Sequence, residues 1–182
     1  KRVIQLGEDP KNVFVVGAPG LENIKKLKLL SKIELEKKIH YKFSKKNLLI
    51  TYHPTTLDKD KNSSERKFLN LLKALDRLKN TNLIFTKANA DTGGAKINLL
   101  IDEYIKKNSK KSWSFTSMGQ INYLSSLKYM DGVIGNSSSG IIEAPSLKIG
   151  TINIGDRQKG RMMAKSIINC SDNINDIIKS IN

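Results

Sequence analysis

Short apolar runs alternate with longer amphipathic stretches along the whole chain. The runs are rich in valine and isoleucine, which is typical of strands buried on both faces of a parallel sheet. We predict five such strands, at residues 12–16, 47–53, 82–86, 132–135 and 151–154. Weaker strand patterns occur in the sequences SWSF, which starts at Ser112, and SIIN, which starts at Ser166.

The stretches between these runs show the three- and four-residue spacing of an amphipathic helix. The clearest apolar stripe follows Asn62 and consists of Phe68, Leu69, Leu71, Leu72, Leu75 and Leu78. A second helix is predicted over residues 93–108, and shorter helices are predicted over 119–130 and 139–147. Helices therefore separate the predicted strands.

Three helix starts carry capping signals. Asn62 with Glu65, and Ser31 with Glu34, have the spacing of a capping box, in which two side chains satisfy the free amides of the first turn. Asp172 can cap the last helix of the chain. These signals support the positions of the helices that the periodicity predicts.

Strand and helix alternate about six times, which predicts one three-layer α/β domain of the Rossmann-like type over residues 1–182. We expect a parallel sheet of about six or seven strands with helices on both faces. No linker and no internal repeat divides the chain. The longest polar loop, 54–65, follows a strand, so it should lie at the sheet edge where open α/β sheets bind ligands.

The 182 residues carry a net charge of +15, which raises nucleic acid as a partner. The lysines are scattered, however, and no basic run is interleaved with aromatic residues. No helix-turn-helix or RNA-recognition signature appears either. We interpret the charge as a solvated basic surface that is compatible with a phosphate-bearing small ligand, and we expect no nucleic-acid partner.

Composition also bears on compartment. No apolar run approaches the roughly 18 residues that cross a bilayer, so we expect no membrane association. The chain starts at Lys1 without a secretion signal, so it reads as a piece of a longer protein, and the cytoplasm is the expected location. The single cysteine, Cys170, excludes a disulfide framework and a cysteine-based zinc site, and it favours a buried structural thiol.

The most distinctive stretch follows the strand at 132–135. The sequence Asn-Ser-Ser-Ser-Gly, with Ser137 and Ser138 at its centre, leads directly into a predicted helix. A helix start presents free amides and partial positive charge, and small side chains let an anion approach the backbone. The stretch is therefore a candidate phosphate seat, although an ordinary helix cap with spare serines has the same sequence.

Two charged residues strengthen the phosphate hypothesis. Glu143 lies on an otherwise apolar part of the same helix, where it is either a solvated charge or an acceptor for two ribose hydroxyls. Arg157 follows the next predicted strand. Because parallel strands end at one sheet edge, Arg157 should face the helix start that holds Ser137, and its planar fork suits a pyrophosphate.

Three further strand exits hold candidate residues. His53 closes the strand at 47–53, where it is a phosphate donor, a general acid or a core histidine held by a turn. Gly17, in the sequence VVGAPG, would allow a ligand to approach the backbone closely, but this pattern falls short of a dinucleotide fingerprint. Asn89 opens the sequence NADTGG, which is either a polar rim of an active site or only a turn.

Four of these stretches carry a resemblance to a known family: RVIQLGEDPKNVFVVGAPG, TYHPTT, SMGQINYLSSLKYMDGVIGNSSSGIIEAPSL and GDRQKGR. In this order they resemble the C-terminal half of the hydrolysing UDP-N-acetylglucosamine 2-epimerases. That group includes bacterial enzymes of sialic acid and legionaminic acid synthesis. The resemblance covers nearly the whole chain and is most specific from GNSSSG to GDRQKGR.

The resemblance implies a two-domain fold of the glycosyltransferase B type, in which residues 1–182 are the UDP-binding C-terminal domain and the N-terminal domain lies outside this chain. It implies that Ser137 and Ser138 hold the diphosphate of UDP or a UDP-amino-sugar, with help from His53 and Arg157. We expect no cofactor and no metal ion, and a homo-oligomer for the full-length protein.

The resemblance assigns further roles to individual residues. Glu143 would bind the ribose hydroxyls, and the backbone near Met118 would frame the uracil. Asn89 would lie near the sugar. His53 would also be a catalytic residue.

The implied reaction eliminates UDP to leave a glycal and then adds water, which inverts carbon 2. The acid–base carboxylates would come largely from the other half, so this chain alone should bind nucleotide weakly and turn over nothing. The donor domain of a true glycosyltransferase is the alternative, because it shares the architecture and a ribose-binding glutamate. The paired NSSSG and GDRQKGR sequences favour the epimerase.

Overall fold

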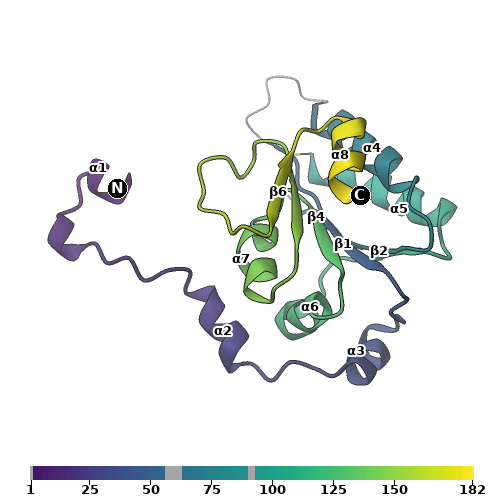
Figure 1. Cartoon of the computed structure of the whole chain (residues 1–182), viewed down its shortest axis with the longest axis horizontal. Coiled ribbons are helices and arrows are strands. Elements are labelled where there is room, and N and C mark those ends of the chain that lie inside the picture. Colours follow the sequence, from purple (N-terminus) through teal and green to yellow (C-terminus); the bar gives the residue numbers. More distant parts are fainter. Residues whose placement is uncertain (1, 56–62, 90–92) are drawn as a thin grey trace.

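The computed structural model describes residues 2–55, 63–89 and 93–182. Within these ranges the chain forms one parallel sheet of six strands, as predicted, with helices on both faces (Figure 1). The strand order is β3-β2-β1-β4-β5-β6, and every neighbouring pair is parallel. The strands are β1 (Asn47–Thr51), β2 (Asn82–Thr86), β3 (Ser112–Phe115), β4 (Gly132–Gly135), β5 (Thr151–Ile154) and β6 (Ile167–Cys170).

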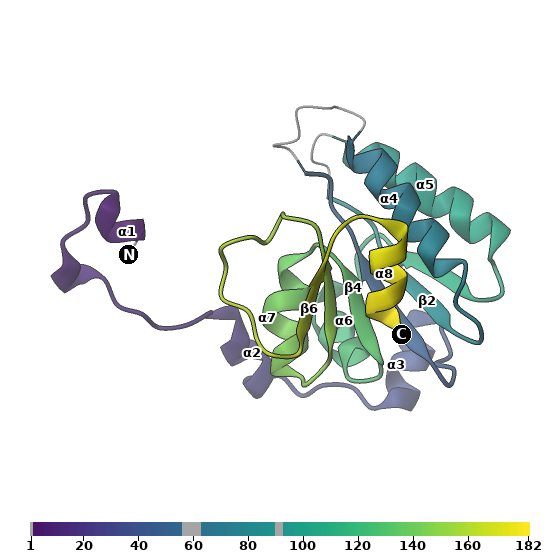
Figure 2. The same ribbon diagram turned by 45° about the horizontal axis from the view of Figure 1, so that its top comes forward.

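Helices cover the two faces of the sheet as separate layers (Figure 2). One core cluster joins the sheet to α4, α5 and α8, and a second joins it to α3, α6 and α7. The helices are α1 (Arg2–Gln5), α2 (Gly20–Lys26), α3 (Lys32–Ile39), α4 (Ser63–Leu75), α5 (Gly94–Lys107), α6 (Gly119–Leu127), α7 (Ser138–Ser146) and α8 (Ile174–Ile181), with a 3-10 turn, η1, at Pro10–Asn12. Across the described ranges, no helix has the length and apolar character needed to cross a membrane.

The direction of winding reverses between β1 and β4. From β1 the chain winds outward through β2 to β3, returns to β4 beside β1, and then winds outward the other way. The helix after β1 therefore covers one face of the sheet, and the helix after β4 covers the other. Ligands of open α/β sheets bind at such a switch point, beyond the carboxyl ends of the strands.

Gly135 permits the close contact between β4 and β1 at this point. Its φ is +145°, and a Cβ at this position would overlap the backbone carbonyl of Thr51. The amide of the next residue, Asn136, donates a hydrogen bond to that same carbonyl at 3.0 Å. Only glycine combines this backbone conformation with this proximity, so Gly135 determines where the chain leaves β4.

The predicted strand at 12–16 is wrong. Residues 13–16 form no strand, and Phe14, Val15 and Val16 are 77%, 94% and 76% exposed. The run belongs to an N-terminal segment that extends away from the sheet (Figure 1). Its composition favours a strand, but a strand is stabilised by pairing, and no described strand lies beside this run. Gly17 follows the run in this segment, so it does not lie at the sheet edge, where we had expected it.

The remaining predictions are mostly confirmed. Both weaker runs form strands, β3 and β6, and Ser31 and Glu34 form a complete capping box at α3. The last helix is capped by Asn173 rather than Asp172, because the Asn173 side chain accepts the Asn175 amide while Asp172 pairs with Lys67. Asn62 lies outside the described residues.

Candidate functional site

The serine-rich turn forms the start of α7 at the carboxyl edge of the sheet. Ser137 is the N-cap, and its side chain accepts the amide of Ser139 at 3.4 Å. Ser138 is the first helical residue, and all three serines of the turn are half-buried. The free amides of the first turn and the partial positive charge of the helix start can therefore receive an anion here.

Asn136 ties this turn to the exit of β1. Its Oδ1 accepts the backbone amide of His53, and its Nδ2 donates to the His53 carbonyl, both at 2.8 Å. This pair of hydrogen bonds brings half-buried His53 beside the serine turn, although 83 positions separate the two residues in sequence. The sequence pattern places Asn136 in the turn but does not indicate its bridging role. Its place directly after a buried strand was the available signal.

The loop after β5 contacts the same residue. Arg157 donates from Nη1 to the Asn136 carbonyl at 3.0 Å, and buried Gln158 donates from Nε2 to that carbonyl at 2.7 Å. Arg157 thus contacts the residue that precedes Ser137, in agreement with our prediction that both residues lie at one edge of the sheet. Arg157 is an exposed residue, and its guanidinium places a positive charge beside the helix start. Gln158 was missed, because its contact depends on the loop and leaves no local pattern.

Glu143 lies one turn further along α7, on the side of α6. Its Oε2 is buried and has no hydrogen-bond partner among the described residues. The nearby hydroxyls of Tyr123, on α6, and Ser139 are 2.6 Å apart. Burial raises the pKa of the Tyr123 phenol to about 12; the hydrogen bond with Ser139 lowers it, and the negative charge of Glu143 raises it. Tyr123 is therefore neutral at physiological pH.

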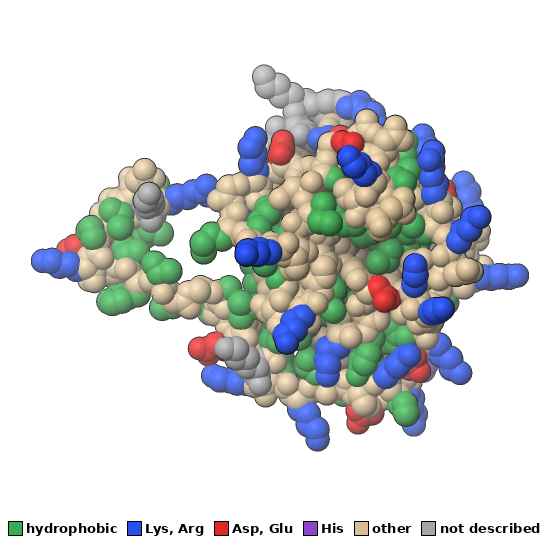
Figure 3. Space-filling view, viewed as in Figure 1, with side chains coloured by type: hydrophobic (Ala, Val, Ile, Leu, Met, Phe, Trp, Pro, Cys, Tyr) green, Lys and Arg blue, Asp and Glu red, His purple; other side chains and the backbone are tan. Residues whose placement is uncertain are grey.

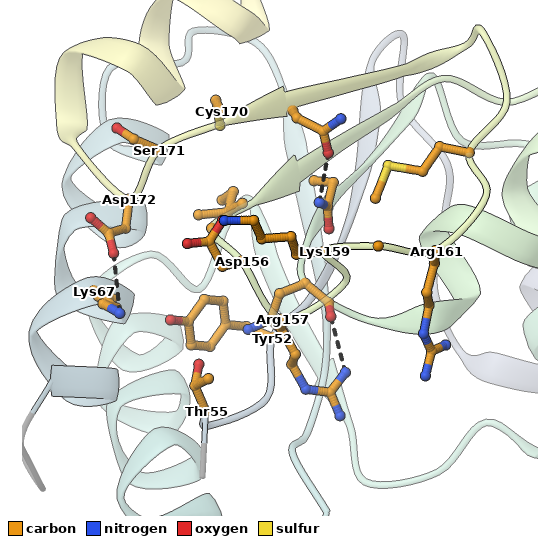
Figure 4. Close-up of a pocket in the computed structure, with 17 residues that line it drawn as sticks. Tyr52, Thr55, Lys67, Asp156, Arg157, Lys159, Arg161, Cys170, Ser171 and Asp172 are labelled. Atoms are coloured by element: carbon orange, nitrogen blue, oxygen red, sulfur yellow. Dashed lines mark hydrogen bonds and ion pairs between the residues drawn. The ribbon is translucent and has the colours of Figure 1, made fainter. Parts of the chain in front are cut away.

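An open cavity of about 680 Å³ lies at the exits of β4, β5 and β6 (Figure 4). Arg157, Lys159 and Arg161 reach its wall from the loop after β5. Lys67 lines the cavity from α4 and pairs with Asp172 at 3.4 Å. Cys170, which we expected to be buried, is half-buried in the cavity wall, and burial raises its pKa.

This cavity adjoins the serine turn but does not include it. Arg157 is its one predicted site residue, whereas Ser137, Ser138 and Glu143 are absent from its described lining. Arg157 and Asn136 form the boundary between the two, because Asn136 also lines the cavity. The carboxyl edge of the sheet therefore has the start of α7, with the Glu143 carboxylate, on one side and the cavity lined by basic residues on the other.

The structure places two other candidates at neighbouring strand exits. The Met118 side chain is 7% exposed in the core, and its carbonyl accepts from Asn122 at 2.8 Å. Asn89 is exposed beyond β2, and its carbonyl lies where a Cβ on Gly94 would overlap it. Both share the carboxyl edge with the serine turn, but no described contact joins them to it.

The lysines and arginines spread over the visible surface rather than gathering into one patch (Figure 3). This distribution agrees with our interpretation of the +15 charge as a solvated basic surface. The chain is therefore a Rossmann-like α/β domain with a helix start at its switch point, the place where open α/β sheets bind ligands.

Comparison with known proteins identifies the family. A family model described as UDP-N-acetylglucosamine 2-epimerase matches residues 1–182, and the chain belongs to that family. The GDP/UDP-N,N'-diacetylbacillosamine 2-epimerase (hydrolyzing) of Campylobacter jejuni is 49% identical over 177 residues, which cover 97% of this chain and 45% of that protein. Polysialic acid biosynthesis protein P7 of Escherichia coli is 44% identical over 183 residues, which cover 100% of this chain and 46% of that protein.

A solved structure agrees on the fold. The UDP-GlcNAc 2-epimerase of Methanocaldococcus jannaschii in complex with UDP-GlcNAc and UDP superposes with a TM-score of 0.67 at 16% identity, covering 98% of this chain and 49% of that one. The chain thus has the fold of about half of a protein of the glycosyltransferase B type. It spans about half the length of the curated relatives that it matches.

Proposed function

We propose that this chain is the UDP-binding half of a hydrolysing UDP-sugar 2-epimerase that releases UDP and an N-acetylmannosamine-type sugar. The observation that carries the proposal is the juxtaposition at the switch point. The first turn of α7 has free amides that can accept an anion, and the Arg157 guanidinium lies beside this turn. The buried Oε2 of Glu143 lies further along the same helix. Family membership and the hydrolysing activity in the name of the Campylobacter jejuni relative support the same function.

The diphosphate is bound at the start of α7 in this proposal. Ser137 and Ser138 supply hydroxyls and amides, and Arg157 supplies charge from the neighbouring loop. His53, held beside the turn by Asn136, donates a hydrogen bond or a proton to the leaving phosphate. These groups would stabilise the charge that develops on UDP as its bond to the sugar breaks, an electrostatic effect that can be large in enzymes.

Glu143 binds the ribose in this proposal. A carboxylate accepts two hydrogen bonds from vicinal hydroxyls, and the buried Oε2 needs a donor that a ligand can bring. The backbone near Met118 would frame the uracil, and Asn89 would lie near the sugar. The backbone at Gly17 would contact ligand only through an arrangement of the N-terminal segment in the whole protein.

The reaction proceeds by elimination and hydration. The sugar loses UDP from carbon 1 and a proton from carbon 2, which leaves a glycal, and water then adds across the double bond with inversion at carbon 2. In this proposal this chain stabilises the leaving group, and carboxylates from the other half move the proton at carbon 2. This chain alone would bind UDP weakly without turnover.

The N-terminal segment belongs to the contact with that other half. Val15 and Val16 are 94% and 76% exposed here, and an apolar run of this kind marks a surface that another segment covers. We further propose that the whole protein works in the cytoplasm as a homo-oligomer in sialic-acid-type sugar synthesis.

The test has a binding arm and a product arm. Calorimetric titration should detect UDP binding to this chain, with uridine as the control that lacks the diphosphate. The whole protein, incubated with UDP-N-acetylglucosamine or a UDP-diacetamido sugar, should release UDP and a free 2-epimer, which NMR identifies. Transfer of the sugar to an acceptor would favour the glycosyltransferase alternative, and absence of UDP binding by the whole protein would refute the proposal.

A further inference from the structure

Serine hydroxyls near carboxylates form hydrogen bonds elsewhere in this chain. Ser31 donates to Glu34 at 2.7 Å, and Ser171 donates to Asp176 at 2.6 Å. The pair on α7 is different. Ser139 lies four residues before Glu143, which places both on one helix face.

The Ser139 hydroxyl instead contacts a residue of the neighbouring helix. It lies 2.6 Å from the Tyr123 hydroxyl, and within the described structure the buried Oε2 of Glu143 has no hydrogen-bond partner. A buried acceptor without a donor is unfavourable, so there must be a reason why Ser139 does not donate to Glu143. The contact with Tyr123 provides one, because it holds Ser139 in a conformation directed at α6.

We propose that Tyr123 is a positioning residue that holds the Ser139 hydroxyl away from Glu143 and so keeps the Glu143 carboxylate open to a ligand diol. This inference rests on the proposed ribose-binding role of Glu143. Without the phenol hydroxyl, the Glu143 carboxylate would be an alternative partner for Ser139 on the same helix face. A ligand hydroxyl would then have to displace Ser139 before it could bind.

Both hydroxyls can take part in this contact at physiological pH. Burial raises the pKa of Tyr123 to about 12, so the phenol stays neutral and can donate or accept. The contact with Ser139 therefore does not depend on which oxygen supplies the proton. Phenylalanine would keep the ring of Tyr123 in place and remove only the hydroxyl.

The first test is Tyr123→Phe in the whole protein, with UDP affinity measured by calorimetry. We expect binding to weaken about fivefold, because the ligand must first displace a Ser139 hydrogen bond worth about 1 kcal/mol. Tyr129→Phe is the matched control. Tyr129 lies just beyond the same helix, and its hydroxyl donates to the Leu30 carbonyl at 3.1 Å rather than contacting Ser139. This control should leave UDP affinity unchanged.

Two comparisons separate positioning from a merely structural role. For 2',3'-dideoxy-UDP, which has no ribose diol, Tyr123→Phe should change nothing. In a Ser139→Ala background, Tyr123→Phe should also change UDP affinity by less than about twofold, because no serine hydroxyl remains to compete. A loss that persists in either comparison would overturn the inference.

A readout without ligand makes the inference testable on its own. A crystal structure of Tyr123→Phe should have the Ser139 hydroxyl turned to the Glu143 carboxylate. An unchanged Ser139 conformation would overturn the proposal, as would an unchanged UDP affinity. If the wild-type protein fails to bind UDP, the proposed function fails, and this inference fails with it. Wild-type UDP binding without an effect of Tyr123→Phe would refute the inference alone.

Discussion

The helices α3 and α7 both have a serine as N-cap, yet the polar groups of the two helix starts are satisfied differently. At α3, Glu34 accepts from the Ser31 amide at 2.9 Å and from its hydroxyl at 2.7 Å, while the Glu34 amide returns to Ser31. At α7, Ser137 caps only the amide of Ser139, and the first turn carries no acidic residue. The acid on this helix, Glu143, comes a turn later and has a buried oxygen without a described partner.

The difference separates a self-contained structural cap from a helix start that is open to a ligand. The exposed start of α3 satisfies its own donors and acceptors, so a ligand has little to gain there. The start of α7 lies at the switch point between β1 and β4 and keeps amides, hydroxyls and a carboxylate available. A helix start can bind an anion only where its own residues leave the first turn open.

The largest expected effect is at the residue that directs β4 into α7. Gly135→Ala should destabilise the fold by about 3 kcal/mol or more, because it combines a strained backbone conformation with overlap of the Thr51 carbonyl. Chemical denaturation measures the loss. Gly20→Ala is the control, since nothing lies near a Cβ there, and it should change stability by less than about 0.5 kcal/mol. Equal stabilities would contradict the close approach of β4 and β1.

The next effect compares the two glutamates. Glu143→Gln should weaken UDP binding about tenfold or more, because glutamine presents donors where the ribose needs acceptors. Glu34→Gln should leave UDP affinity unchanged. Calorimetry with UDP and dideoxy-UDP measures both variants, and the Glu143→Gln loss should nearly vanish without the diol. An unchanged UDP affinity of Glu143→Gln would mean that the start of α7 is only a structural helix cap.

A placed guanidinium should matter more than general positive charge. Arg157→Ala should reduce UDP affinity about fivefold, since Arg157 is anchored on the Asn136 carbonyl beside the serine turn. Lys159→Ala removes a charge from the same loop and should have less than about a twofold effect. Titrations at one ionic strength measure both. Similar losses would mean that the loop acts through its total charge.

The smallest effect concerns α3 and is one of stability. The hydrogen bonds from the side chain and backbone of Ser31 lower the pKa of Glu34. Their contribution to folding stability is therefore complete above the ordinary carboxyl pKa and is lost as the pH falls below it. Glu34→Gln should flatten this acid-side loss in thermal melts across pH. Ser31→Ala should destabilise by about 1 kcal/mol without changing UDP affinity. A change in UDP affinity would remove the distinction between the two starts.

Local patterns in the sequence determined most helices and strands and the location of the candidate site at the carboxyl edge of the sheet. The run at 82–86 and the helix stripe from Phe68 to Leu78 are recognisable because burial repeats at a short, fixed period. The placement of Ser137 and Arg157 at one edge followed from a single rule, that neighbouring parallel strands end on the same side. The elements depend on residues within a few positions of one another, and the shared edge follows from the order of the elements without any contact between Ser137 and Arg157.

Tertiary structure decided what depends on distant partners. The runs at 12–16 and 132–135 look alike in sequence, but only the second lies between two strands that pair with it. The bridge from Asn136 to His53 joins residues 83 positions apart, and the contact between Tyr123 and Ser139 joins residues 16 apart on different helices. Pairing and side-chain hydrogen bonds need atoms within about 3 Å, and only the assembled fold brings distant residues that close.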